Sequence, residues 1–435
     1  MEAEVTYGAI SLIPVVVIIT MALITKKTFE PLLVAVLVAV IIDTGPDFLE
    51  GFVITLLTQM ADPVIGWVIL VCGMMGALLF ILEKSNAAGA FADLLAKFAK
   101  TRKRAMFATM FFGICLFIDD YLNVLTVGST MKKVTDKHNV SRTMLAYSVH
   151  STAAPICILA PISTWAIFFM SLMAGEGIEG PDGTIFSAYL NVIPYLFYGW
   201  ICVFIVLPLV ILGVIPLVGP MKSQFEHAQK TGELFPPGIP PQGNVSDSEL
   251  EKTKAGMWDF ILPLVVLVGA TLYFERDVLM GVVVALAFTA VLYIVRKIAK
   301  LNELVEQFWS GFATMLQVFG LLVLAFSFAD ATANLGLIDY VLEVVAPIMS
   351  GDLLPAVVFV VTAAMAFAMA NFWGLAAIVL PIAVPLANMM GVDVYLVCAA
   401  VFCGAAFGSH ACFYADSCIL TGQATNLRPY DHAIT

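Results

Sequence analysis

The chain has little charge and long stretches with none at all. Charged side chains make up 12% of the 435 residues, apolar side chains make up 61%, and the mean hydropathy is +0.98. An average soluble domain is about half apolar and about a quarter charged. This composition excludes an ordinary soluble protein. It predicts an all-α polytopic membrane protein that is surrounded by the lipid bilayer and has no nucleic-acid partner.

Several enzyme and metal motifs are also missing. The eight cysteines lie in apolar stretches without a CxxC spacing, which indicates small buried side chains. The GxGD and GxSx patterns of intramembrane proteases and the HExxH pattern of zinc proteases are absent. We therefore expect a protein that is not an enzyme and has no cofactor, with Na⁺ and H⁺ as transported or coupling ions.

Apolar runs long enough to cross a bilayer, about 20 residues each, occur at six places. They are 7–25, 52–82, 186–216, 257–274, 278–295 and 303–329, with a shorter run at 31–43. Three regions are too long or too interrupted for one helix: 104–131, 142–173 and 352–425. Acids precede the first run and Lys26 and Lys27 follow it, which is the reverse of a secretory signal. We expect the N-terminus outside the cell membrane.

Region 104–131 allows two interpretations. A single crossing would place Lys132 and Lys133 opposite Arg102–Arg104, against the positive-inside rule. A re-entrant hairpin that turns at Asp119–Asn123 keeps both basic clusters cytoplasmic. With a matching hairpin at 353–390, every Lys and Arg except Arg276 lies inside, and the C-terminus is cytoplasmic. We prefer the hairpin.

The two halves of the chain then share one plan. Residues 1–218 form a first repeat plus a connecting helix, 219–256 form a cytoplasmic polar linker, and 257–435 form a second repeat of inverted topology. Each repeat has a re-entrant hairpin, an interrupted helix and an amphipathic interfacial helix, at 89–100 and 335–349. Inverted repeats with broken helices are typical of secondary transporters. A passive channel would explain polar residues in the membrane but not this two-fold plan.

The first hairpin has two acids at its tip, in the sequence FIDDYLN. Thirteen helical residues before Asp119 rise about 20 Å, which is deep in a hydrocarbon layer about 30 Å thick. Charge at that depth is kept mainly for function. Asp119 and Asp120 are both candidate cation- or proton-binding groups. Adjacent acids point in different directions, so we favour Asp120 over Asp119 as the exchanging carboxylate. The alternative is that Asp119 and Asp120 only cap the hairpin.

The interrupted helices offer further oxygen ligands. In the first, Pro155 and Pro161 free backbone carbonyls beside several hydroxyls, which suits a small cation. The alternative is that these hydroxyls only satisfy their own backbone. In the second, we expect Asp416 to be buried without a basic partner, and His410 to be either a titrating partner or a structural residue. The candidate ligands are Asn123, Ser151, Thr152, Asn371, Ser409, His410, Ser417 and Thr421.

Four blocks resemble the NhaC-type sodium/proton antiporter family of the ion transporter superfamily. They are FIDDYLNVLTVGSTM (117–131), TDKH (135–138), STAAPICILAPISTW (151–165) and ADSCILTGQATN (415–426). The resemblance implies two inverted repeats, a homodimer with a scaffold and a moving transport domain, and exchange of Na⁺ for H⁺. Some relatives exchange malate and lactate. The family's histidine block is GSHACFYADS here, with Ser409 in place of its leading acid.

The resulting hypothesis is competition at shared carboxylates. Na⁺ and H⁺ bind mutually exclusively to Asp120 and Asp416, and hydroxyl oxygens complete the ligand set. The alternative function is a Na⁺- or H⁺-coupled transporter of small organic anions or amino acids. In that case the helix N-termini at the two breaks would hold the carboxylate of the substrate.

Overall fold

The chain is helical wherever its structure is described. The computed structural model describes residues 7–25, 29–237, 255–275, 277–337, 340, 344, 350–369, 372–412 and 415–435, and no strand occurs among them. The predicted all-α fold is therefore confirmed. The candidate ligand Asn371 lies outside the described residues, as does most of the predicted interfacial helix at 335–349.

Six helical spans in the described residues are long and apolar enough to cross a membrane, and a bent pair makes a seventh. The six spans are Phe29–Met60, Ile65–Lys84, Arg142–Gly175, Val278–Val295, Leu301–Asn334 and Val394–Ala411. The bent pair joins Ile185–Tyr195 to Phe197–Leu212 at an angle of 56°. The chain is thus a multi-pass membrane protein.

The helices form two compact units, and each unit draws on both halves of the sequence. The first unit consists of 1–70, 167–196 and 316–409, and the second of 71–166, 197–315 and 410–435. Neither unit coincides with a predicted repeat. The division into repeats around 219–256 stays a prediction.

The first unit packs long apolar helices around buried aromatic side chains. α2 packs against α1 and α18, and α21 packs against α18 and α20. The rings of Phe169 and Phe402 stack in parallel with centroids 3.9 Å apart. Its helices are α1 (Ile13–Thr25), α2 (Phe29–Thr44), α3 (Phe48–Met60), the start of α4 (Pro63–Lys84), most of α10 (Thr164–Gly175), α11 (Ile185–Val192), α18 (Leu316–Asn334), α20 (Leu354–Met369), α21 (Phe372–Met390) and α22 (Val394–Ala411) up to Ser409.

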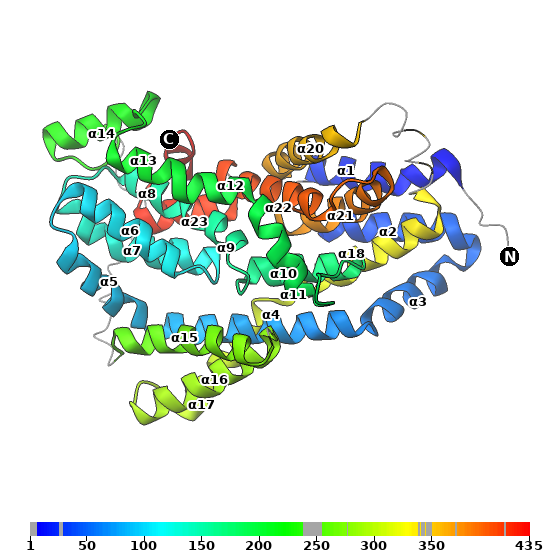
Figure 1. Cartoon of the computed structure of the whole chain (residues 1–435), viewed down its shortest axis with the longest axis horizontal. Helices are drawn as coiled ribbons and strands as arrows, with labels where there is room; N and C mark the ends of the chain where they lie inside the picture. Colours follow the sequence, from blue (N-terminus) through cyan, green and yellow to red (C-terminus); the bar gives the residue numbers. More distant parts are fainter. Residues whose placement is uncertain are drawn as a thin grey trace. The chain divides into compact units, whose positions relative to one another are not determined.

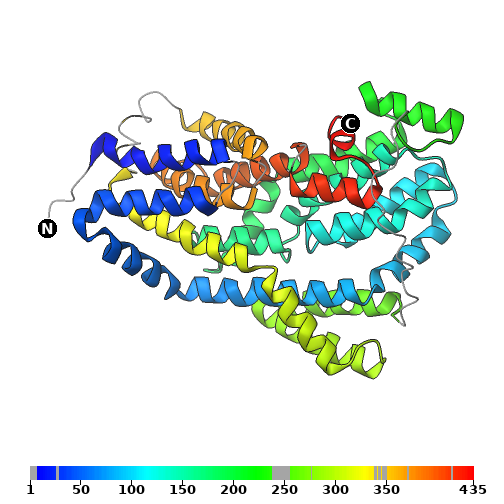
Figure 2. The same cartoon turned by 180° about the vertical axis from the view of Figure 1, so that it is seen from behind.

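The second unit contains most of the predicted site. α7 packs against α6, α8 and α23, and α15 packs against α16 and α5. Figure 2 shows the red α23 alongside the cyan α7. Besides the rest of α4, its helices are α5 (Ala87–Phe98), α6 (Arg102–Cys115), α7 (Asp120–Asp136), α8 (Arg142–Ser151), α9 (Ala154–Leu159), α12 (Phe197–Trp200), the π-helical segment Ile201–Val206, α13 (Leu207–Leu212), α14 (Gly219–Thr231), α15 (Met257–Tyr273), α16 (Val278–Val295), α17 (Leu301–Ala313), α23 (Asp416–Thr425) and α24 (Pro429–Ala433).

Helices α6 and α7 form a helical hairpin, and its re-entrant position in the membrane stays a prediction. They lie side by side in Figure 1, and the chain reverses between Cys115 and Asp120. The turn comes slightly before the expected Asp119–Asn123, because Asp119 already caps α7. α20 and α21 pack together as the second hairpin, with Asn371 outside the described residues.

Both predicted interrupted helices are broken. α8 ends at Ser151, α9 spans only six residues around Pro155, and α10 starts after Pro161. α22 ends at Ala411 and α23 begins at Asp416.

Besides the bent run 186–216, two runs that were expected to be single helices are each divided in two. Residues 52–82 fall into α3 and α4, which meet at Asp62 and Pro63, and 303–329 fall into α17 and α18. Proline lacks the amide donor that a helix interior needs, so it starts α4 instead of continuing α3. The expectation of unbroken helices was wrong in both places.

Candidate functional site

Asp119 is the N-cap of α7. Its Oδ1 accepts a hydrogen bond from the backbone N–H of Leu122 at 3.0 Å, and its Oδ2 accepts one from the Thr164 hydroxyl at 2.9 Å. A cap of this kind satisfies an amide that the helix leaves open. Because Thr164 begins α10, Asp119 also ties the hairpin to the broken helix. Both of its oxygens are engaged in structure.

Asp120 is fully buried, and its two oxygens differ. Oδ1 accepts a hydrogen bond from the indole N–H of Trp165 at 2.9 Å. Oδ2 receives none within the described residues. Buried polar atoms nearly always have a partner, so an orphaned carboxylate oxygen calls for a proton or a cation to complete it.

Asn123 joins the hairpin to the first broken helix. Its Nδ2 donates to the carbonyls of Gly113 and Thr152, each at 2.7 Å, and to that of Leu116 at 3.3 Å. The contact is tight, because a Cβ added at Gly113 would lie 2.0 Å from the Thr152 hydroxyl. The amide is therefore fixed in orientation. Its Oδ1 is buried and, in the described part of the chain, accepts no hydrogen bond.

The two orphaned oxygens belong to neighbouring side chains. Asp120 and Asn123 are three residues apart on α7, and side chains at that spacing share one helix face. Both side chains are fully buried. One carboxylate and one amide oxygen on the same face are the hard ligands that a small cation takes.

Asp416 differs from its expected environment. It is exposed, and its Oδ2 accepts a hydrogen bond from the Tyr121 hydroxyl at 3.2 Å. The expectation of a buried carboxylate was therefore wrong. The break before α23 puts Asp416 in the first turn of that helix. Tyr121 directly follows Asp120 in the chain, so this hydrogen bond links Asp416 to the start of α7.

Some of the candidate hydroxyls hydrogen-bond to the backbone of their own helices, as the alternative interpretation predicts. The hydroxyls of Thr152 and Thr421 donate to carbonyls of their own helices, at 3.0 Å to Val149 and 2.6 Å to Ser417. Ser151 is fully buried, and its carbonyl lies 3.8 Å from the thiol of Cys202. Each hydroxyl oxygen keeps lone pairs, so a role as a cation ligand stays a prediction.

Three histidines, His150, His410 and His432, lie close to one another near Ser417. His150 Nδ1 lies 2.8 Å from His432 Nε2, and His150 Nε2 lies 3.1 Å from the Ser417 hydroxyl. The rings of His150 and His410 meet edge to face, with centroids 4.6 Å apart, and the Tyr198 hydroxyl lies 2.7 Å from His410 Nδ1. The histidines thus connect α8, α23 and α24.

Of the predicted residues, the second unit joins Asn123 to Thr152 by a hydrogen bond, and it places Ser417 against His150, which the sequence had not indicated. Ser409 is fully buried but belongs to the first unit. Sequence reasoning missed Tyr121, Trp165, Tyr198 and His432 as partners. A usable signal existed for Trp165, because an indole N–H in an apolar span needs an acceptor.

Part of the chain is similar in sequence to a known protein family. Residues 250–434 match the family described as the Na+/H+ antiporter family. An uncharacterized protein of Haemophilus influenzae strain Rd is 26% identical over 394 residues, which cover 83% of this chain and 73% of that protein.

The family match agrees with the NhaC-type resemblance. It supports a transporter of cations and protons in general terms, and the family is one of transporters and not of enzymes. The matched residues include Asp416 and the break before α23, whereas the hairpin acids precede them.

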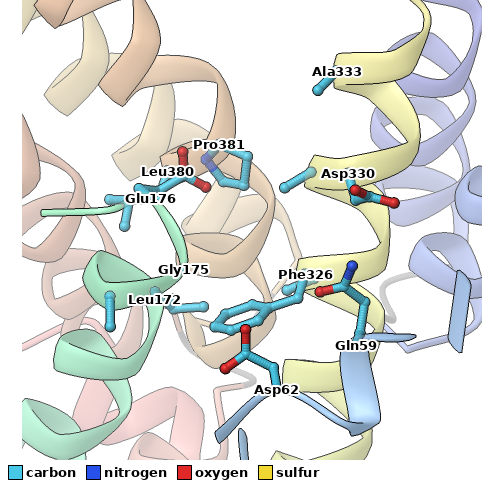
Figure 3. A pocket seen from close by; sticks show the side chains of 13 residues that line it. Gln59, Asp62, Leu172, Gly175, Glu176, Phe326, Asp330, Ala333, Leu380 and Pro381 are labelled. Atoms are coloured by element: carbon cyan, nitrogen blue, oxygen red, sulfur yellow. The ribbon is translucent and has the colours of Figure 1, made fainter. Parts of the chain in front are cut away.

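The first unit contains a separate acidic pocket. This cavity has a volume of about 360 Å³. Figure 3 shows Asp62, Glu176 and Asp330 around it, together with Gln59. These side chains come from the end of α3 and the residues after it, the end of α10, and α18. Burial raises the pKa of Glu176 to about 7. In the sequence, Asp330 lies between Ala329 and Ala331.

Proposed function

We propose that the chain exchanges Na⁺ for H⁺ across the membrane and that Asp120 is the group for which the two ions compete. The orphaned oxygens of Asp120 and Asn123 carry this proposal. They are buried, they share one face of α7, and they lie in a hairpin of a multi-pass membrane protein. Their chemistry suits Na⁺ through oxygen ligands, or a proton on the carboxylate.

Competition provides the coupling in this proposal. Asp120 can hold a proton or share a negative charge with Na⁺, but it cannot do both. A transporter that reorients only when the carboxylate is neutralised then exchanges one ion for the other without a separate coupling device. The indole of Trp165 and the amide of Asn123 hold the ligand oxygens in place during binding.

Asp416 is the second ionisable group of the proposed site. Its exposed position suits an ion that arrives from water, and Tyr121 connects it to the hairpin. Ser417, held by His150, follows it in the same helical turn. We propose Ser151, Thr152, Ser409, His410 and Thr421 as further ligands or positioning groups.

Proteoliposomes test the proposal. Purified protein is reconstituted with a pH-sensitive dye inside, and the internal pH is followed after external addition of Na⁺, Li⁺, K⁺, malate, lactate or amino acids. We expect Na⁺ to drive proton movement. Asp120→Asn should reduce this movement to background and Asp416→Asn should reduce it strongly, because neither amide can exchange a proton.

Asp119→Asn is the matched control, since asparagine is also a good N-cap. We expect it to keep exchange. Retained Na⁺-driven proton movement in both Asp120→Asn and Asp416→Asn would refute the site. Proton movement driven by malate, lactate or an amino acid, with Na⁺ required but not sufficient, would support the alternative of cation-coupled organic-anion or amino-acid transport.

The proposed topology has the N-terminus outside, the C-terminus cytoplasmic, and both basic clusters of the hairpin on the cytoplasmic side. We also propose that each chain contains two inverted repeats and that two chains form a homodimer. Single cysteines at the exposed Lys133 and Arg104 test the hairpin in intact cells. Both should be protected from an impermeant thiol reagent applied outside. Labelling of position 133 alone would indicate a single crossing.

A further inference from the structure

The second unit has another cavity, away from the carboxylates. It has a volume of about 320 Å³ and lies between the start of α6, α8, the end of α13 and α14. Its floor is apolar, with Met106 and Met144 nearly fully buried and Val210 and Phe225 partly buried. The cavity therefore offers a surface for a hydrocarbon chain.

The rim of this cavity is positively charged. Arg102 and Lys103 line it, and none of its lining residues is acidic. Lys103 donates one hydrogen bond to the carbonyl of Leu212 at 2.7 Å, and Arg102 donates to the side chain of Gln229. An ammonium has three donors and a guanidinium has five, so both retain capacity for an anion.

The end of α13 and the loop after it expose apolar side chains beside the cavity. Leu212 is 45% exposed, Val214 is 66% exposed and Val218 is 73% exposed. Exposed apolar side chains this close together in the sequence suit a contact with protein or membrane. Directly after them, α14 turns polar with Lys222 and Glu226. The cavity thus lies where apolar and polar surfaces meet, as at a membrane interface.

We infer that this cavity binds one anionic phospholipid. The phosphate pairs with Arg102 and Lys103, and an acyl chain covers Met106 and Val210. Charge complementarity selects this occupant, because an apolar cavity with two cations and no acid on its lining matches a ligand with one hydrocarbon part and one anionic part. A neutral lipid would fill the cavity but leave the cations without a counter-ion.

Native mass spectrometry of the delipidated full-length protein tests the inference. The protein is titrated with phosphatidylglycerol, with phosphatidylcholine of the same chains, and with inorganic phosphate. We expect one phosphatidylglycerol to bind about tenfold or more tightly than phosphatidylcholine, and phosphate alone to bind far more weakly. The double variant Arg102→Gln/Lys103→Gln should lose this preference.

Lys297→Gln/Lys300→Gln is the matched control, because it removes two exposed positive charges from the same unit without touching the cavity. It should keep the preference. Val210→Trp fills the cavity and leaves the charges in place, so it should weaken binding of both lipids. Size-exclusion elution and Tm identify any variant that fails to fold.

Equal binding of the two lipids to the unaltered protein would overturn the inference. So would normal phosphatidylglycerol binding by a folded Val210→Trp variant, or binding of inorganic phosphate as tightly as of the lipid. A concentration-dependent dimer that Val210→Trp dissociates would show that a second copy of the chain occupies the cavity instead. The assay measures binding alone, so it does not depend on the proposed exchange.

Discussion

Trp165 donates its indole N–H to Asp120 Oδ1 at 2.9 Å, and both side chains are completely buried. Trp165 lies in the first turn of α10, whereas Asp120 opens α7 at the hairpin tip. An indole N–H can only donate, so this bond favours an oxygen that carries negative charge. Trp165 therefore orients Asp120 and stabilises the form that binds a cation.

Trp165→Phe removes the donor and keeps an aromatic ring. The ionised form of Asp120 then loses a hydrogen bond worth about 1.5–3 kcal/mol, so protons compete more effectively with Na⁺. We expect the acid side of the exchange-versus-pH profile to move by about one unit toward higher pH. Proteoliposome exchange between pH 5.5 and 9 measures the shift.

The control for this experiment is Trp309→Phe, because Trp309 is 63% exposed on α17. Its profile should match that of the unaltered protein. A lower maximal rate for Trp165→Phe at every pH, with an unmoved profile, would indicate a packing role alone.

Asp119 should matter for stability more than for exchange. Asp119→Ala removes the cap of α7 and the acceptor for Thr164, which we expect to destabilise the fold by about 1–3 kcal/mol. Asp119→Asn keeps an oxygen for both donors and should lose much less. Thermal unfolding in detergent gives both values. A larger effect of Asp119→Asn on exchange than on Tm would assign Asp119 to ion binding.

The features that follow from local chemistry were predictable from the sequence. Basic residues on both sides of 104–131 indicate a hairpin, and Pro155 and Pro161 indicate a broken helix, because each has a direct physical consequence. The start of α4 at Pro63 was also readable in principle. Pro63 indicates a helix start, but the unbroken apolar run 52–82 favoured a single helix.

Features that depend on distant packing were not predictable. The break between α17 and α18 has neither proline nor glycine at Thr314. It follows Gly311, where an added Cβ would lie 2.4 Å from the carbonyl oxygen of Gly76 on α4. Likewise, nothing near Asp416 in the sequence identifies Tyr121 as its partner or shows that it is exposed. Such contacts depend on which helices meet.

His432 should make the protein less stable in acid. Burial, and then the charge of His410, lower the pKa of His432 to about 3. The unfolded chain binds a proton near pH 6.5 that the folded chain does not, so stability falls as the pH drops below that value. We expect a loss of about 2 kcal/mol by pH 5 that is absent in His432→Gln.

Tm measured between pH 5 and 8 in detergent checks this difference. His227→Gln is the control, because His227 lies at the surface beside Glu233 and is remote in sequence from the histidine cluster. Equal acid sensitivity of His432→Gln and the unaltered protein would mean that His432 is protonated in the folded state.

Glu176 should have the opposite effect on stability. Its pKa is raised from 4.5 to about 7, because the half-buried carboxyl is shielded from water at the acidic pocket. Between those values the unfolded chain has already released the proton that the folded chain retains, so stability falls as the pH rises from about 4.5 to about 7. Ionising this carboxyl costs about 3 kcal/mol of folding stability once the pH is above its pKa in the folded chain.

Glu176→Gln avoids this loss and should raise Tm at pH 8 more than at pH 5. Glu179→Gln, an exposed neighbour, should change Tm little at either pH. A Glu176→Gln gain that is the same at both pH values would mean that Glu176 is already ionised in the folded protein at pH 5.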